Sequence, residues 1–240
     1  RIFRELRTND FQAVLDRYAS LSESTVSKYK QLVTSMSDWA MREEIITPNF
    51  ASYCSAKGRK SVSHSTLTEN EIKRIEKAAE KDERAKIVCM LLATGMRISE
   101  LFMLPLADYK ETYCIGGEKT EEGENRIIPI REEGRPYFAY FAKKAKGELL
   151  LSGYSGNRSA RNYRRRDYYP LLESLGIDKS KTPHSTRTTY TTRAVDEGLS
   201  PAVTQKVLGH ADFDTTQKYY NRPDADALVA AVDKAASGKS

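Results

Sequence analysis

The chain has 240 residues, of which 39% are hydrophobic and 30% charged, and 39 Lys and Arg residues against 33 Asp and Glu give a formal net charge of +6. This length fits one large domain or two smaller ones, and the composition excludes a collagen-like, low-complexity or wholly disordered chain. No apolar run approaches the roughly 18 residues that a membrane span needs, and the first residues do not form a signal peptide, so we expect a cytosolic protein.

The cysteines exclude a further class of protein. Cys54, Cys89 and Cys114 are odd in number and show no CxxC spacing. A disulfide framework is therefore ruled out, and a structural zinc site is not expected. We interpret the three as reduced thiols and expect no metal or other cofactor.

Residues 1–60 predict a small all-α lobe. One helix is expected over 10–18, and from Glu23 apolar residues recur at helical spacing as far as Ala40. The polar, basic stretch that follows predicts a linker over 61–67 and a domain boundary there. Basic residues outnumber acidic ones in this lobe, so we expect it to help hold DNA. The candidate DNA contacts are Lys28, Lys30, Arg59 and Lys60.

Residues 68–223 predict a larger domain with one β-hairpin. Thr68 and Glu71 form a capping-box pattern, the apolar run 87–93 predicts a buried helix, and Gly95 suits a left-handed helix end. Two β-prone segments joined by a polar turn predict the hairpin. The hairpin strands are expected over 112–117 and 125–130. Helices are expected over 69–79, 98–104, 134–145, 158–174, 185–197, 201–208 and 212–221, with a last one over 224–236. The fold class is thus mainly α with a small antiparallel β-sheet.

A run of arginines marks the predicted helix 158–174. Arg158, Arg161 and Arg165 would share one helical face, and Arg164 and Arg166 lie beside them. Such a row suits a line of phosphates, but a solvated helix face has the same composition. Charge alone leaves both interpretations open. We treat Arg158, Arg161, Arg164 and Arg165 as candidate DNA contacts.

Five basic residues and one tyrosine are interpreted together as parts of one site. His184 and Arg187 are three apart, so they would point from one helical face into a shared site. His210 follows a Leu-Gly pair, and Tyr219 comes nine residues later on a predicted short helix. The full set is Arg97, Lys119, His184, Arg187, His210 and Tyr219.

These residues stand in motifs that resemble those of the tyrosine recombinases, the phage-integrase family. The motifs are ATGMRISEL (93–101), KT (119–120) followed by RIIPI (126–130), TPHSTR (182–187), and LGH (208–210) with the tyrosine at 219. All four occur in the family's order. Residues 22–50 more weakly resemble the family's helical core-binding domain, so the resemblance implies an all-α core-binding domain followed by an α+β catalytic domain.

The resemblance implies a reaction that needs neither metal nor ATP. Tyr219 would attack a DNA phosphodiester, form a 3′-phosphotyrosine and release a 5′-hydroxyl, which keeps the bond energy for religation. Arg97 and Arg187 would bracket the non-bridging oxygens with guanidinium forks. Lys119 would protonate the leaving oxygen, His184 would act as acid or base, and His210 would hydrogen-bond the phosphate.

Each of these residues also has a structural interpretation. Arg97 alone would be taken for an ion-pair partner of Glu100, and Lys119 for a solvated turn lysine. The histidines would be core or capping residues, or zinc ligands, although the third histidine of the chain lies in the linker. Tyr220 lies next to Tyr219, and only one of the two can face a phosphate on a helix. Thr188 stands where many relatives have a second histidine, and the polar Ser185-Thr186 pair leaves the local packing open.

The resemblance also implies partners. Duplex DNA carrying a recombination site is the expected substrate, and relatives assemble as tetramers that exchange strands through a Holliday junction. The tail 224–240 would dock on a neighbouring protomer or pack on its own domain, and accessory DNA-bending or excision factors are conceivable. We expect no membrane partner and a location on the nucleoid. Because the chain begins with Arg1, a preceding arm-binding domain is one hypothesis and a trimmed tag another.

The leading hypothesis is a site-specific recombinase that integrates or excises a phage or conjugative transposon. Three alternatives stay open. A chromosome-dimer-resolving recombinase would have the same active site, and a type IB topoisomerase would share the tyrosine chemistry without a defined DNA site. A non-catalytic DNA-binding regulator would have no chemical reason to keep all six residues.

Overall fold

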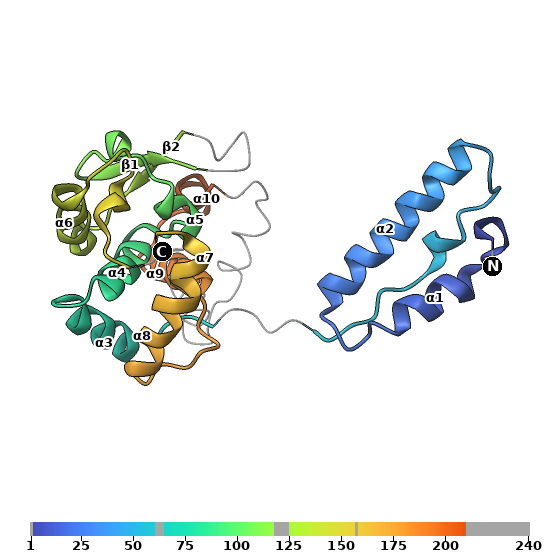
Figure 1. The fold of residues 1–240 in the computed structure, drawn as a ribbon, viewed down its shortest axis with the longest axis horizontal. Coiled ribbons are helices and arrows are strands. Elements are labelled where there is room, and N and C mark those ends of the chain that lie inside the picture. Colours follow the sequence, from blue (N-terminus) through green and yellow to red (C-terminus); the bar gives the residue numbers. More distant parts are fainter. Residues whose placement is uncertain (1, 61–64, 118–124, 157, 210–240) are drawn as a thin grey trace, which may run out of the picture. The chain divides into compact units, whose positions relative to one another are not determined.

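A computed structural model describes residues 2–60, 65–117, 125–156 and 158–209 (Figure 1). The chain divides into two compact units, 1–63 and 64–240. The described part is mainly helical with one two-stranded antiparallel sheet, which confirms the predicted fold class. None of its helices is long and apolar enough to cross a bilayer.

The 1–63 unit is built on two helices, α1 (Thr8–Asp16) and α2 (Glu23–Arg42). Their mutual core consists of Phe11, Leu15, Val26, Ala51 and Cys54. The predicted first helix is shifted by two residues, because the side chain of Asp10 accepts a hydrogen bond from the Arg7 amide and so starts α1 earlier. The chain after Cys54 returns beside the start of α2, where Arg59 N donates to Leu21 O at 2.8 Å.

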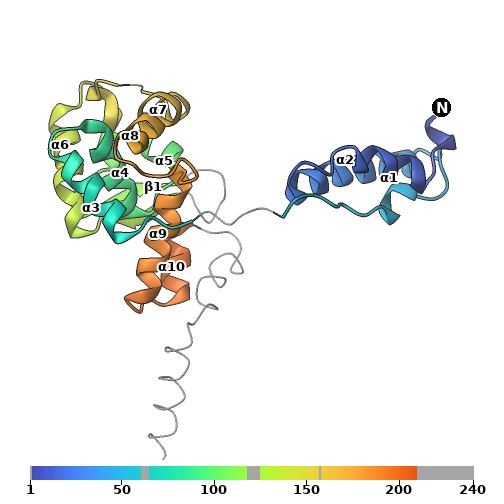
Figure 2. The same cartoon turned by 90° about the horizontal axis from the view of Figure 1, so that it is seen from below.

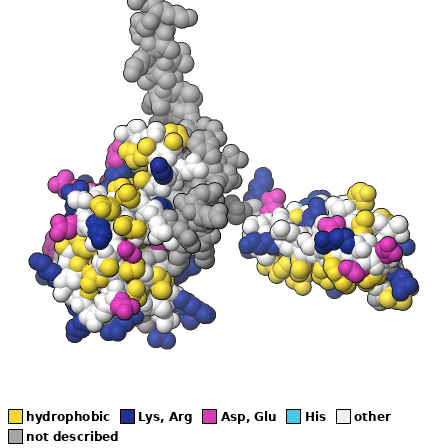
Figure 3. All heavy atoms as spheres, turned by 90° about the horizontal axis from the view of Figure 1, so that it is seen from above, with side chains coloured by type: hydrophobic (Ala, Val, Ile, Leu, Met, Phe, Trp, Pro, Cys, Tyr) yellow, Lys and Arg dark blue, Asp and Glu magenta, His cyan; other side chains and the backbone are white. Residues whose placement is uncertain are grey.

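Part of the apolar face of α2 is exposed in the described unit. Leu32, Met36 and Trp39 expose about half of their surface each, at 58%, 49% and 53%. Figure 3 shows hydrophobic side chains gathered along one side of this unit. The same stripe that predicted an amphipathic helix is therefore only partly used for packing within the unit.

The described part of the 64–240 unit is built around α4 (Glu83–Thr94), in which every residue from Ala85 to Thr94 is buried. Packed on it are α3 (Glu69–Ala79), α6 (Arg135–Lys144) and α9 (Pro183–Asp196) (Figures 1 and 2). The Thr68–Glu71 capping box is formed as predicted. Gly95 ends α4 at φ 65° and turns the chain into α5 (Ile98–Phe102).

The predicted hairpin is present as β1 (Tyr113–Gly116) and β2 (Arg126–Pro129). The register pairs Cys114 with Ile128 and Gly116 with Arg126. The turn between them, which contains Lys119, lies outside the described residues. β2 packs against α10 (Pro201–Leu208), so the hairpin and the last described helix are neighbours.

The predicted single helix over 158–174 is wrong in detail. Instead α7 (Ala160–Tyr163) passes through a π-helical turn, Arg164–Tyr168, into α8 (Tyr169–Ser174). Pro170 has no N–H to bond the carbonyl four residues earlier, which accounts for a wider turn at this place. Arg158 precedes the N-cap Ser159, so the predicted common helical face of Arg158, Arg161 and Arg165 does not form.

Helix α9 is buried although it is rich in threonine. Its buried threonine hydroxyls bond carbonyls of the preceding turn, as Thr189 Oγ1 does to Ser185 O at 2.8 Å and Thr191 Oγ1 to Arg187 O at 2.8 Å. Ser185 and Thr186 are fully buried, and Thr186 donates to Pro183 O at 2.8 Å. The polar Ser185-Thr186 pair is thus compatible with packing. The predicted helices over 212–221 and 224–236 lie outside the described residues.

We predict that Gly95→Ala destabilises the protein strongly. A Cβ at this position would lie 2.7 Å from the Tyr190 ring and 2.8 Å from Leu208, on a left-handed backbone. The strained φ and the overpacking together should lower the free energy of unfolding by about 3 kcal/mol, measured by urea denaturation. Gly198→Ala is the matched control, because Gly198 has φ +80° and a Cβ added there would meet no atom within 4 Å. It should cost only about 1 kcal/mol, and equal losses would contradict the steric argument.

Candidate active site

A cavity of about 370 Å³ brings together three of the six residues that the sequence singles out. Arg97, His184 and Arg187 all line it, from the α4–α5 junction and the first turns of α9. Arg164 lines it too, from the π-helical turn. Lys119, His210 and Tyr219 lie outside the described residues, so their positions stay predictions.

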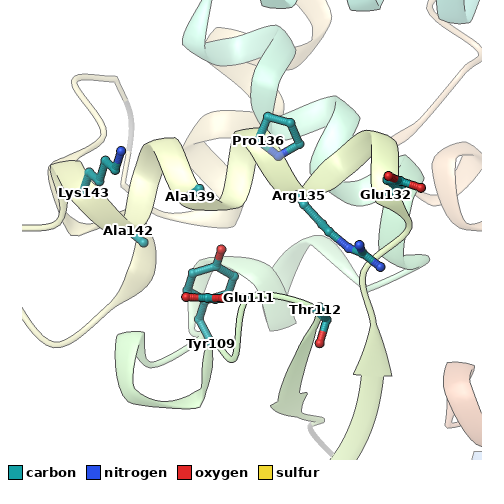
Figure 4. Close-up of a pocket in the computed structure, with 9 residues that line it drawn as sticks. All are labelled: Tyr109, Glu111, Thr112, Glu132, Arg135, Pro136, Ala139, Ala142 and Lys143. Carbon is teal, nitrogen blue, oxygen red and sulfur yellow. The ribbon is translucent and has the colours of Figure 1, made fainter.

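A larger cavity, of about 690 Å³, lies elsewhere in the same unit, between α6 and the segment that leads into β1. Figure 4 shows Tyr109 beneath α6 and Arg135 extending from the start of that helix. Its lining contains none of Arg97, His184 and Arg187, the three singled-out residues that the structure describes. We place the candidate active site in the smaller cavity because Arg97, His184 and Arg187, the three described residues of the set, line it together.

Arg97 is bonded to Glu100 and is still partly exposed. It occupies the N-cap position of α5, where its backbone N–H donates to Glu100 Oε2 at 2.9 Å and its Nη1 pairs with Oε1 at 2.8 Å. The Arg97 side chain is nevertheless 39% exposed, while that of Glu100 is 1% exposed. The predicted ion pair with Glu100 is therefore present, and it orients a guanidinium that still faces the cavity.

Arg187 is almost fully buried, with 2% of its surface exposed. Its Nη1 donates to Gly95 O at 2.9 Å and its Nη2 to Leu208 O at 2.6 Å. It thereby ties the α4–α5 junction to the carboxyl end of α10. A guanidinium carries five N–H donors, so these two bonds are compatible with contacts to a phosphate.

His184 stands in the first turn of α9 and is exposed. The capping side chain of Thr182 accepts from the His184 backbone N–H at 3.2 Å. Because Arg187 follows one turn later, both side chains reach the same cavity, as the spacing predicted.

Beneath Arg97 lies a buried charged network that the sequence interpretation did not assign to the site. Arg126 Nη2 pairs with Glu100 Oε2 at 2.8 Å, and both side chains are at most 5% exposed. Burial by itself would raise the pKa of Glu100, but the hydrogen bonds and charge of Arg126, and then those of Arg97, hold it below its usual value. The signal was available in the RIIPI strand, since Arg126 shares its face with the core residue Ile128.

Arg164 is exposed at the mouth of the cavity. Its Nε and Nη2 donate to the Tyr169 hydroxyl at 3.2 and 3.1 Å, and the guanidinium carbon lies 5.7 Å from the Tyr169 ring centroid. Arg164 was predicted only as a DNA contact, and the structure places it in the lining of the cavity that Arg97 and His184 also line.

The other candidate DNA contacts lie on the surface. Lys28, Arg59 and Lys60 are exposed in the 1–63 unit, and Lys30 is half-buried. Arg158, Arg161 and Arg165 are exposed in the other unit. On the face drawn in Figure 3, Lys and Arg side chains are spread over several places of the 64–240 unit and interspersed with acidic ones. Binding of DNA by these residues stays a prediction.

A family profile described as the phage integrase family matches residues 65–226. The chain is 26% identical over 215 residues to tyrosine recombinase XerD of Oceanobacillus iheyensis, covering 82% of this chain and 71% of that protein. It is 31% identical over 154 residues to tyrosine recombinase XerA of Saccharolobus solfataricus, covering 64% of this chain and half, 50%, of that protein.

Two solved structures share the fold. The Tn1549 transposon integrase (aa 82–397) in complex with circular intermediate DNA superposes with a TM-score of 0.79 at 22% identity, over 97% of this chain and 86% of that one. A λ integrase tetramer bound to a Holliday junction superposes with a TM-score of 0.70 at 18% identity, over 90% and 64%.

We predict that Glu100→Gln lowers stability in a pH-dependent way. The ionised carboxylate offsets two guanidiniums in a buried place, so its loss should cost about 3 kcal/mol at pH 7. Because the folded-state pKa is lowered, that contribution is complete above the ordinary Glu value of about 4.3 and disappears as the pH falls through the lower folded value. Urea unfolding at pH 7 and pH 3 measures the difference from the unsubstituted protein, which should shrink at pH 3.

Glu76→Gln, at an exposed position on α3, is the control and should change stability little at either pH. A Glu100→Gln penalty of the same size at both pH values would contradict an ionised, doubly paired carboxylate.

Proposed function

The chain belongs to the phage integrase family, the tyrosine recombinases, and from that premise we propose that it cuts and rejoins duplex DNA at a specific site through a 3′-phosphotyrosine. The observation that carries the proposal is the cavity in which Arg97, His184 and Arg187 converge. This cluster offers a phosphodiester two guanidiniums and an imidazole, which suits a reaction that develops charge on phosphate oxygens.

In the proposed reaction the phenol oxygen of Tyr219 attacks the phosphorus, so that a P–O bond to tyrosine forms while the P–O5′ bond breaks. Arg97 and Arg187 bracket the non-bridging oxygens, and His210 hydrogen-bonds one of them. Lys119 gives a proton to the departing 5′-oxygen, and His184 serves as acid or base for the phenol proton. The reverse steps, with a 5′-hydroxyl of another strand, rejoin the DNA without ATP or metal.

The burial of Arg187 adds a second part to its role. Since its guanidinium bonds the carbonyls of Gly95 and Leu208, it fixes the backbone immediately before His210 as well as offering donors to the phosphate. Arg97, by contrast, is paired with Glu100 and lines the cavity with a side chain that is 39% exposed. The two arginines are therefore suited to different tasks, one as a rigid anchor and one as an exposed fork.

The proposed biological role is integration and excision of a mobile element by four copies of the chain on two DNA sites, through a Holliday junction and on the nucleoid of the cytoplasm. It is supported by the similarity of fold to the Tn1549 and λ integrases, the latter as a tetramer on a Holliday junction. Accessory bending or excision factors and docking of the tail 224–240 on a neighbour belong to the same proposal.

A second candidate role is resolution of chromosome dimers, because the sequence relatives include XerD and XerA recombinases. The two roles differ in the sites they join. A dimer resolver exchanges strands between identical sites, whereas an integrase joins two different ones. Plasmids that carry either two copies of one cleavage site or two different sites, incubated with the protein, separate the roles by which plasmid recombines.

The first prediction for this function is a covalent adduct at Tyr219. The probe is a pool of duplexes nicked within a randomised segment, in which cleavage beside the nick releases a short strand and traps the complex. The protein should form an SDS-stable adduct that peptide mapping places on Tyr219, and Tyr219→Phe should abolish it while DNA binding remains. Tyr220→Phe is the matched control and should keep the adduct. An adduct on Tyr220 would refute the assignment, and its absence with every duplex would contradict the proposed chemistry.

The second prediction concerns Arg97. Arg97→Lys keeps the positive charge but loses the planar fork, so single-turnover cleavage of the most enriched duplex from that pool should slow by about 100-fold or more. The Kd for the duplex, from fluorescence anisotropy, should change far less. Arg193→Lys, which alters an Arg–Glu pair with Glu69 on the surface, should cleave normally. A cleavage rate of Arg97→Lys close to that of the unsubstituted protein would show that the fork is not used.

A further inference from the structure

Arg126 is an arginine at a core position of a strand. Along β2, burial alternates, and Arg126 points inward with Ile128 while Ile127 and Pro129 are exposed. Its side chain is 5% exposed. A buried charge of this kind costs free energy unless it is paired and hydrogen-bonded, so its partners indicate what it does.

Two of those partners belong to other segments of the fold. Nη2 pairs with Glu100 Oε2 at 2.8 Å on α5, and Nε donates to Val207 O at 2.9 Å at the carboxyl end of α10. A Cβ built on Gly209 would lie 3.1–3.3 Å from the Arg126 side chain, so the α10 cap packs directly against it. One guanidinium thus joins α5, β2 and α10.

Each joined segment leads to a residue of the proposed site. Glu100 holds the backbone N–H and the Nη1 of Arg97. Val207 and Leu208 precede His210 in the sequence, and their carbonyls are held by Arg126 and Arg187 respectively. β2 is the strand that follows the Lys119 turn in the sequence.

We propose that Arg126 is a positioning residue of the recombination reaction, which holds Arg97 through Glu100 and the end of α10 through the Val207 carbonyl in one fixed arrangement. The proposal rests on the proposed function, since it assigns Arg126 a task in that reaction. Arg126 is not among the described residues that line the cavity, so the task assigned to it is performed through Glu100 and the end of α10.

A role in packing alone would not favour this arrangement. Replacing a buried ion pair by apolar side chains of similar volume is often neutral or stabilising, so an Arg–Glu pair is a poor choice for stability. A planar fork, however, reaches two acceptors on different segments in fixed directions, which neither an apolar side chain nor a lysine can do. Small errors in the position of Arg97 would matter, because a misplacement of about 1 Å can cost about 100-fold in rate.

The network also sets the charge state of Glu100. The charged groups in contact with it in the described part of the chain are Arg97, from its own segment, and Arg126, from β2. Against the effect of burial, Arg126 contributes more than Arg97 to keeping the Glu100 pKa below its usual value. Without Arg126, Glu100 would take up a proton at higher pH and release Arg97.

The test compares Arg126→Met and Arg126→Lys with the unsubstituted protein and with Arg193→Met, which removes a surface Arg–Glu pair. The probe is the most enriched nicked duplex from the randomised pool, with its single-turnover cleavage rate, its Kd and the pH dependence of cleavage as readouts. Arg126→Met should slow cleavage by about 100-fold, leave the Kd nearly unchanged, and move the acid limb of the pH profile to higher pH.

Arg126→Lys should keep the acid limb near its original place, because the charge beside Glu100 remains, yet cleave more slowly because one ammonium cannot hold both acceptors in the same directions. Arg193→Met should resemble the unsubstituted protein. If Arg126→Met does not fold, the double variant Arg126→Met/Glu100→Leu takes its place, because it removes both buried charges. The double variant should fold and bind DNA. Its cleavage should be slowed by about 100-fold, as expected for Arg126→Met.

The proposal is overturned if the folded Met, Lys or double variants cleave at the original rate. It is also overturned if cleavage and DNA affinity fall together with an unchanged pH profile, which would indicate a structural role. Adduct formation by the unsubstituted protein is scored first, so a failure of the proposed function is distinct from a failure of this inference.

Discussion

A buried carboxylate shared by two guanidiniums is the interaction on which the site depends. Glu100 is 1% exposed at its side chain and accepts from the Arg97 guanidinium on one oxygen and from the Arg126 guanidinium on the other. In a place of low dielectric such a carboxylate is stable only while both partners stay in position. The pair therefore fixes the direction of Arg97, whose side chain lines the cavity.

The rest of the larger unit brings four segments to that carboxylate and its neighbours. They are the α4–α5 junction, β2, the start of α9 and the end of α10. The buried helix α4 ends at Gly95, whose left-handed conformation turns the chain so that Arg97 begins α5. Helix α9 can be buried because its threonine hydroxyls bond its own carbonyls, and it presents His184 and Arg187 at its start. Two arginines then hold successive carbonyls at the end of α10, so the backbone before His210 is fixed by charge-assisted hydrogen bonds.

Local patterns in the sequence were sufficient for much of this architecture. The capping box at Thr68, the apolar run of α4, the helix end at Gly95 and the two strands of the hairpin follow from short-range rules, and the structure confirms them. The π-helical turn Arg164–Tyr168 was not predicted, because the sequence pattern over 158–174 is that of a continuous helix. The wider turn arises where Pro170 lacks the N–H that a regular helix needs. The burial of Arg126 was missed for another reason. Its partner Val207 is 81 residues away in the sequence, and no sequence periodicity indicates a contact over that distance.

For the site, motif order identified Arg97, His184 and Arg187 as neighbours. The hydrogen bonds that orient these side chains became visible only in three dimensions.

The most direct test of the account is a crystal structure of the Tyr219→Phe protein bound to the most enriched nicked duplex, with the phosphate next to the nick located in the density. The account predicts that this phosphate lies in the cavity within hydrogen-bonding distance of Arg97 and Arg187, with Glu100 still between Arg97 and Arg126. A phosphate seated instead on the exposed arginines near α7, with the cavity remote from the DNA backbone, would contradict it.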